Sequence, residues 1–131
     1  MDHPTVFPVL RYADAHSAME FLVAAFGAEK HSVYADGGRV QHAELRLGNG
    51  IVMLGSGDAS ANASVYVVVD DPDARCARAR AAGAEIVREP HDTEYGSREY
   101  GARDPEGNEW SFGTYQPFAF DHAAAETLAA S

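Results

Sequence analysis

The chain has very little cysteine and very little lysine. Cys76 is the only cysteine among 131 residues, so neither an internal disulfide nor a cysteine-rich metal site can form. Lys30 is the only lysine, and ten basic residues stand against twenty acidic ones, giving a formal net charge of −10. An acidic chain without a basic cluster is poorly suited to phosphate backbones and anionic membranes. We therefore expect no nucleic-acid partner and no membrane partner.

Long apolar runs and several familiar motifs are also missing. No run approaches the roughly 18 apolar residues that span a bilayer, and the first residues do not have the pattern of a signal peptide. The chain carries no P-loop, no G-x-S-x-G turn and no H-E-x-x-H helix. Cys76 has no partner histidine at a readable position, and we interpret it as a small buried residue. We expect one cytoplasmic domain that spans residues 1–131.

The first half of the chain predicts a strand, a helix and three further strands. Asp14 is a typical N-cap, the residues after it form one apolar stripe, and Gly27 is a typical helix stop. Glycine-rich turns separate the strands that follow. The expected elements are a strand at 5–12, a helix at 15–26 and strands at 29–35, 39–47 and 51–55.

The same order recurs after the small, polar linker 56–63. The segment from Asp14 to Gly27 aligns without a gap with the segment from Asp70 to Gly83, and Gly48-Asn49 matches Gly107-Asn108. The expected elements are strands at 64–69, 85–89, 98–103 and 109–114, a helix that ends at Ala82, a longer loop at 90–97 and an alanine-rich tail at 116–131. The sequence thus predicts an α+β fold of two βαβββ modules, at about 5–55 and 64–115. Eight strands would surround a concave cavity, with the helices outside.

Three stretches carry a resemblance to a known family. They are LRYAD…AMEFLVAAFGAE, HAELRLGNGIVML and YGSREYGARDPEGNEW. With the order of elements, they resemble the vicinal oxygen chelate superfamily, which contains glyoxalases, bleomycin-resistance proteins and extradiol dioxygenases. The resemblance covers roughly residues 5–115 and implies a homodimer whose cavities are completed across the subunit boundary.

The resemblance also implies where a metal would bind. Metal-dependent members place His, Gln or Glu on the first and last strand of each module. Carried over to this chain, these positions fall at Phe7 or Pro8, about Val52, about Ser64, and Ser111. Apolar side chains and serine hydroxyls are not a competent ligand set for a divalent metal. We therefore expect no metal at this site and no other cofactor.

Polar residues on the strand at 39–47 are candidates for ligand binding. Its apolar residues are expected to pack under the helices, which turns His42, Glu44 and Arg46 toward the cavity. His42 and Glu44 lie on one face about 7 Å apart along the strand, close enough to bind one ligand or to act as an acid–base pair. The alternative is a pair of solvated residues at the sheet margin.

The second module supplies the other candidates. Tyr66 shares a face with Ser64, and Ser111 lies on the last strand, so both are expected in the cavity. Tyr95, Arg98 and Tyr100 lie on or after the long loop, where a rim or lid is expected, and Arg98 suits an anionic group of a ligand. A surface arginine is the alternative for Arg98. Trp110 and Phe112 are expected to pack in the core against the second helix.

Three functions remain open from the sequence. The missing metal ligands favour a binding protein that sequesters a small organic molecule such as a drug or metabolite, cationic or aromatic in character. The alternative is a metal-dependent lyase, isomerase or dioxygenase of the same superfamily with a non-standard site around His42 and Glu44. A third possibility is an interaction domain that only dimerises.

Overall fold

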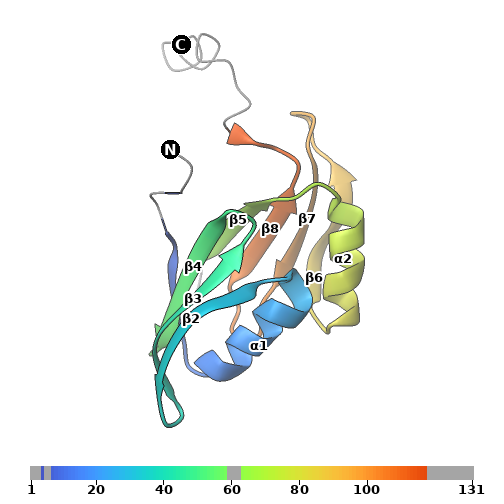
Figure 1. Cartoon of the computed structure of the whole chain (residues 1–131). Helices are drawn as coiled ribbons and strands as arrows, with labels where there is room; N and C mark the ends of the chain where they lie inside the picture. Colours follow the sequence, from blue (N-terminus) through green and yellow to red (C-terminus); the bar gives the residue numbers. More distant parts are fainter. Residues whose placement is uncertain (1–3, 5–6, 59–62, 118–131) are drawn as a thin grey trace.

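The computed structural model describes residues 4, 7–58 and 63–117, which form two four-stranded sheets and two helices (Figure 1). Parts of the expected first strand, linker and tail lie outside the described residues. The elements are β1 (Val9–Tyr12), α1 (Ala15–Phe26), β2 (Glu29–Asp36), β3 (Arg39–Leu47), β4 (Gly50–Ser56), β5 (Ser64–Val68), α2 (Pro72–Ala81), β6 (Glu85–Asp92), β7 (Arg98–Arg103) and β8 (Glu109–Gly113).

The two sheets have the same strand order, which confirms the repeat predicted from the sequence. Sheet A runs β1-β4-β3-β2, and sheet B runs β5-β8-β7-β6. In each sheet the first strand pairs in parallel with the last, and the remaining pairs are antiparallel. Most strand bounds agree with the sequence within two residues. One difference is β6, which continues three residues into the expected loop at 90–97 and ends at Asp92.

Equivalent caps begin the two helices. The carboxylate of Asp14 accepts hydrogen bonds from the backbone N–H and the hydroxyl of Ser17, at 3.1 and 2.8 Å. In the second module the cap is Asp71, whose carboxylate accepts from the N–H of Ala74 at 3.1 Å. The sequence alignment had matched Asp14 with Asp70, one residue too early. Gly27 ends α1 with a φ of 77°, the left-handed conformation that favours glycine.

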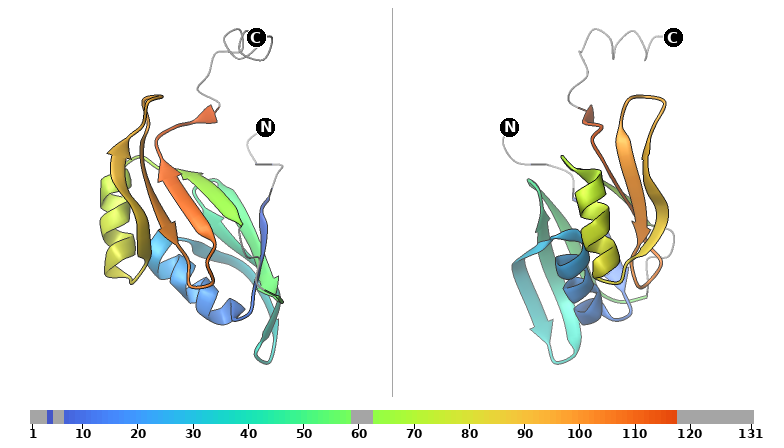
Figure 2. Two further views of the ribbon diagram at one scale, coloured as in Figure 1. Left: turned by 180° about the vertical axis from the view of Figure 1, so that it is seen from behind. Right: turned by 90° about the vertical axis from the view of Figure 1, so that its right-hand side faces the viewer.

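The helices lie between the two sheets rather than outside them (Figure 2). Arg75 and Arg78 of α2 donate hydrogen bonds to the carbonyl oxygens of Phe26 and Ala24 at the end of α1. The α+β fold of two four-stranded modules is therefore confirmed, but in the described residues the helices lie between the sheets, where the sequence analysis had placed them outside. Sequence alternation predicts which face of a sheet is apolar, but not which module covers that face.

One hydrophobic core joins both modules through the helix layer. The buried residues come from the helix-facing sides of both sheets and from both helices. Trp110 and Phe112 are buried there, as predicted, and both rings also contact Phe26 of α1, at centroid distances of 5.2 and 4.9 Å. The last strand of the second module thus packs on the helix of the first. None of the helices in the described ranges is long and apolar enough to cross a bilayer.

The turn between β7 and β8 anchors the second module to the first. Asp104 is buried, and its carboxylate accepts a 2.6 Å hydrogen bond from the hydroxyl of Tyr12 on β1. The carboxylate of Glu106 accepts from the backbone N–H groups of Ala13 and Asp14, at 2.6 and 2.7 Å. The turn that is most recognisable in the sequence is therefore a contact between modules.

Candidate functional site

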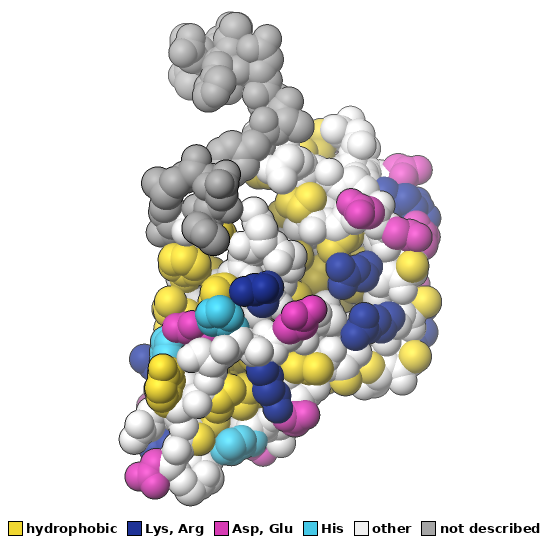
Figure 3. Space-filling model, in the orientation of Figure 1, with side chains coloured by type: hydrophobic (Ala, Val, Ile, Leu, Met, Phe, Trp, Pro, Cys, Tyr) yellow, Lys and Arg dark blue, Asp and Glu magenta, His cyan; other side chains and the backbone are white. Residues whose placement is uncertain are grey.

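Each sheet has one face on the helices and one open face that points away from them. Strand alternation decides which residues fall on which side. On the open face of sheet A, the large side chains of Val9 and Tyr34 remain exposed, as Tyr66 and Val68 do on sheet B. In the view of Figure 3, hydrophobic side chains reach the surface between charged groups of both signs. The open faces are thus partly apolar surfaces available to a ligand or another chain.

A pocket of about 580 Å³ lies on the open face of sheet B. Its lining residues are Tyr66, Tyr95, Glu99, Ser111, Tyr115 and Pro117. Tyr66 and Ser111 are cross-strand neighbours on β5 and β8, so the sheet itself forms the floor. A second hollow of about 530 Å³ lies where the β3–β4 turn meets β5, lined by residues that include 47–52 and 65–68.

Hydrogen bonds fix the side chains around the first pocket. The Tyr95 hydroxyl donates to the carboxylate of Glu99 at 2.9 Å, and the Tyr66 hydroxyl donates to the carbonyl of Tyr115 at 2.9 Å. The contact with Glu99 raises the pKa of Tyr95, and burial raises the pKa of Tyr66. Both phenols therefore stay neutral donors at physiological pH, and their rings wall the pocket.

An arginine lies flat on the sheet beside this pocket. Arg88 of β6 donates to the hydroxyl of Ser111 at 2.7 Å and to the carboxylate of Glu109 at 2.9 Å. A Cβ atom on Gly101, its partner on β7, would lie only 2.4 Å from the guanidinium, so glycine is what leaves room for the arginine. Sheet A has a similar pair, because a Cβ atom on Gly55 would lie 2.7 Å from Arg11.

On sheet A, the predicted pair of His42 and Glu44 lies on the open face, as expected. Nε2 of His42 is 2.9 Å from one carboxylate oxygen of Glu44, and Nε2 of His31 is 3.9 Å from the other. These side chains are partly exposed and do not line the pocket on sheet B. Nothing in the sequence pattern indicated that His31 lies near Glu44.

The strand positions that the resemblance assigns to metal ligands do not fit a divalent metal. Val52 points into the core, and its neighbours on the open face are Ile51 and Met53. Ser111 offers one hydroxyl, which already accepts from the guanidinium of Arg88, and a single neutral hydroxyl is a weak ligand for a divalent metal. Within the described ranges, no three His, Cys, Asp or Glu side chains are grouped so that they could hold a metal ion.

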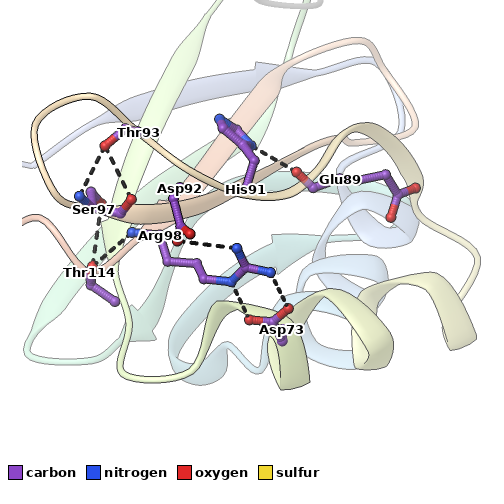
Figure 4. A network of polar contacts seen from close by, with 8 residues as sticks. All are labelled: Asp73, Glu89, His91, Asp92, Thr93, Ser97, Arg98 and Thr114. Carbon is purple, nitrogen blue, oxygen red and sulfur yellow. Dashed lines mark hydrogen bonds and ion pairs between the residues drawn. The ribbon is translucent and has the colours of Figure 1, made fainter.

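Besides His42 and Glu44, two further predicted site residues lie away from the pocket. Tyr100 is 1% exposed on the helix-facing side of β7 and stacks on Phe112 with a centroid distance of 4.9 Å, so its place on a rim or lid was wrong. Arg98 turns toward α2, where Asp73 binds it with two hydrogen bonds and Asp92 with a third (Figure 4). These carboxylates raise the pKa of Arg98 and occupy its donors, which supports the surface interpretation.

Sequence reasoning missed three residues of the pocket, Glu99, Tyr115 and Pro117. Glu99 follows directly from alternation once Tyr100 is placed in the core, because adjacent strand residues point to opposite faces. Tyr115 follows the last strand, where no periodic pattern applies. Its position depends on a hydrogen bond from its N–H to the hydroxyl of Ser97, which joins two segments far apart in the sequence.

Comparison with known proteins finds relatives by sequence and by structure. An uncharacterized protein of Mycobacterium bovis, Mb0911c, is 34% identical over 125 residues, which cover 84% of this chain and 82% of that protein. The crystal structure of TioX from Micromonospora sp. ML1 superposes with a TM-score of 0.78 at 32% identity, covering 86% of this chain and 99% of TioX. Lactoylglutathione lyase from Agrobacterium tumefaciens shares the fold, with a TM-score of 0.66 at 22% identity over 84% of this chain and 93% of that one.

The family model of the Glyoxalase/Bleomycin resistance protein/Dioxygenase superfamily matches residues 1–112. This span contains both sheets up to the middle of β8 and both helices. The repeated topology, the sequence match and the structural neighbours agree. The chain belongs to the Glyoxalase/Bleomycin resistance protein/Dioxygenase superfamily.

Proposed function

We propose that the protein binds a small organic molecule between two copies of the chain, without a metal at the superfamily's ligand positions. The observation that carries this proposal is the direction of the open faces. Because the helices fill the space between the two sheets, the open face of sheet B points away from sheet A of the same chain. Sheet A of a second copy is a surface of suitable size and character to close the pocket on sheet B.

The composition of the open faces supports a binding role. Tyr34 is 61% exposed and Tyr66 is 39% exposed, and tyrosine rings are enriched on surfaces that bind a partner. Aromatic rings beside hydroxyl and carboxylate groups are typical of small-molecule pockets. Ser111 and its bound guanidinium stand where a metal-dependent relative needs a carboxylate.

A complementation experiment tests the shared site. Met53→Trp and Ser111→Trp each place a bulky ring at the middle of one open face, Met53 on sheet A and Ser111 on sheet B. Each variant alone is expected to lose ligand binding. In a mixed dimer, both rings fall in one site and the other site is intact. Equal mixing of the two variants should thus restore about a quarter of the sites.

The ligand for this experiment comes from a thermal-shift screen of cationic glycopeptides and small aromatic metabolites. Sedimentation analysis of the wild-type chain should show a dimer, and metal analysis should find less than one equivalent after dialysis. A binding-competent monomer, or a mixture of the two variants that restores nothing, would overturn the shared site. Stoichiometric metal that survives dialysis would overturn the metal-free part of the proposal.

One contact favours a second function, an enzyme of the lyase or isomerase type. His42 and Glu44 are 2.9 Å apart on an open face, the arrangement of a general base and the carboxylate that orients it. In a dimer they would face the partner's sheet B. Turnover of a bound compound that falls at least about a hundredfold in His42→Ala, with binding retained, would establish this function. Unchanged turnover in that variant would exclude these residues as the catalytic pair.

A further inference from the structure

Three tyrosine rings and one carboxylate enclose the pocket on sheet B. The rings of Tyr95 and Tyr115 are 5.6 Å apart and meet at 83°, so they form two perpendicular walls. The hydroxyl of Tyr66 donates to the carbonyl of Tyr115, which brings the Tyr66 ring to the floor beside them. We call the group of Tyr66, Tyr95, Tyr115 and Glu99 the tyrosine cage.

The carboxylate of Glu99 makes the cage acidic. It accepts a hydrogen bond from the Tyr95 hydroxyl at 2.9 Å, and none of the residues that line the pocket is basic. Arg88, beside the pocket, is already paired with Glu109. Gly113 on β8 leaves room for this arrangement, because a Cβ atom there would lie 2.5 Å from Cγ of Glu99 and 2.8 Å from the Tyr66 hydroxyl.

The walls of the cage are held in place before any ligand arrives. Ser97 is buried in the loop before β7, and its N–H donates to the hydroxyl of Thr93 at 3.0 Å (Figure 4). The hydroxyl of the same serine accepts from the N–H of Tyr115 at 3.1 Å. One buried residue thus fixes both the loop that carries Tyr95 and the segment that carries Tyr115. Pre-formed walls lower the entropy lost when a ligand binds.

We propose that the tyrosine cage binds a cationic group of an organic ligand, of the alkylated or quaternary ammonium class. This inference rests on the proposed function and specifies the ligand of the same pocket. Aromatic faces attract such cations through their quadrupoles, and quaternary ammonium groups need no hydrogen-bond acceptor. The Glu99 carboxylate adds an opposite charge, and the net charge of −10 attracts cations over a longer range. An anionic group would meet the carboxylate instead.

Choline and its neutral carbon isostere, in which a quaternary carbon replaces the nitrogen, provide the direct test. The two compounds have nearly the same shape, so a difference in affinity reports charge recognition. NMR titration of the full chain should show choline shifting the signals of the cage and binding at least about tenfold more tightly than the isostere. Equal affinities for the two compounds, or no binding of choline, would overturn the proposal.

Variants of the cage distinguish the contribution of the Glu99 charge to binding from that of the Tyr95 ring. Glu99→Gln and Tyr95→Leu should each weaken choline binding about tenfold, whereas Tyr95→Phe keeps the ring and should stay within about threefold of wild type. Glu94→Gln removes a carboxylate from the same loop outside the pocket and should change nothing. Unchanged binding in Glu99→Gln, or an equal loss in Glu94→Gln, would contradict the cage.

The cage and the proposed function can fail separately. If neutral aromatic compounds bind and the Met53→Trp and Ser111→Trp mixture restores their sites, the shared pocket stands and the cage is wrong. If choline binds with the expected variant pattern to a chain that stays monomeric, the cage stands and the shared pocket is wrong.

Discussion

The hydroxyl of Tyr12 donates a 2.6 Å hydrogen bond to the carboxylate of Asp104, which joins the first strand of one module to the last turn of the other. The same carboxylate accepts from the ring N–H of Trp110 and the side-chain amide of Asn108, each at 3.1 Å. Burial and the contact with Asp104 raise the pKa of Tyr12. The turn that identifies the family in the sequence thus has a structural role.

Asp104→Ala should destabilise the protein by about 3 kcal/mol, because it leaves the buried donors of Tyr12 and Trp110 without an acceptor. Tyr12→Phe removes one donor together with its need for a partner and should cost only about 1 kcal/mol. Urea unfolding followed by circular dichroism measures both. A smaller loss in Asp104→Ala than in Tyr12→Phe would contradict this role.

Asp14 should make stability depend on pH in acid. Hydrogen bonds from Ser17 lower the pKa of Asp14 below its ordinary value of 3.8. A lowered folded pKa stabilises the protein above the unfolded pKa, and this stabilisation is lost as the pH falls through the folded pKa. Asp14→Asn keeps a capping side chain without the charge. Relative to this variant, the wild type should lose stability as the pH falls below about 4, and parallel unfolding midpoints over that range would refute the prediction.

Replacing either of two tyrosines of sheet B should have opposite effects on stability and on ligand binding. Tyr100→Ala removes a ring from the core and should cost about 3–5 kcal/mol of unfolding free energy. Tyr66→Ala, on the open face, should change stability much less and weaken ligand binding. Thermal unfolding and a binding titration on both variants provide the comparison. A larger loss of stability in Tyr66→Ala would mean that the two faces of the sheet are assigned the wrong way round.

Gly113→Ala should narrow the pocket while the fold is kept. The new methyl group would push the side chain of Glu99 and the hydroxyl of Tyr66 into the space that a ligand needs. We expect at least about tenfold weaker binding with a change in stability below about 1 kcal/mol. Gly38→Ala, where a Cβ atom meets nothing within 4 Å, is the matched control. Equal affinities for the two variants would show that Gly113 does not limit the pocket.

Local signals in the sequence predicted most of the fold. Asp14 and Gly27 mark the ends of a helix through interactions with their nearest neighbours, so their meaning does not depend on the rest of the chain. Because these signals recur in the second half of the chain, they predicted both modules. Alternation along β8 correctly placed Trp110 and Phe112 in the core. The family resemblance was also confirmed. It rests on turn and cap motifs, which are local signals of the same kind.

The errors arose where distant segments meet. The bounds of β7 were predicted correctly, but the side of the sheet on which Tyr100 lies is set by its stacking on Phe112. Tyr115 contributes to the pocket only because Ser97 binds its N–H from another segment. The helices lie between the sheets because Phe26 packs on Trp110 across the two modules. Neither contact has a periodic signature in the chain.

The helix layer between the two sheets divides the strand residues into two groups under different evolutionary constraints. Residues that pack against the helices, such as Leu45 and Phe112, determine whether the chain folds. Residues on the opposite faces, such as Glu44 and Ser111, have few ties to that core and can change with little loss of stability. After gene duplication, copies of this chain can therefore change the residues of their open faces, and with them what they bind, and still fold. A duplicated module that keeps its core inside is well suited to a superfamily whose members diverge in chemistry but retain one architecture.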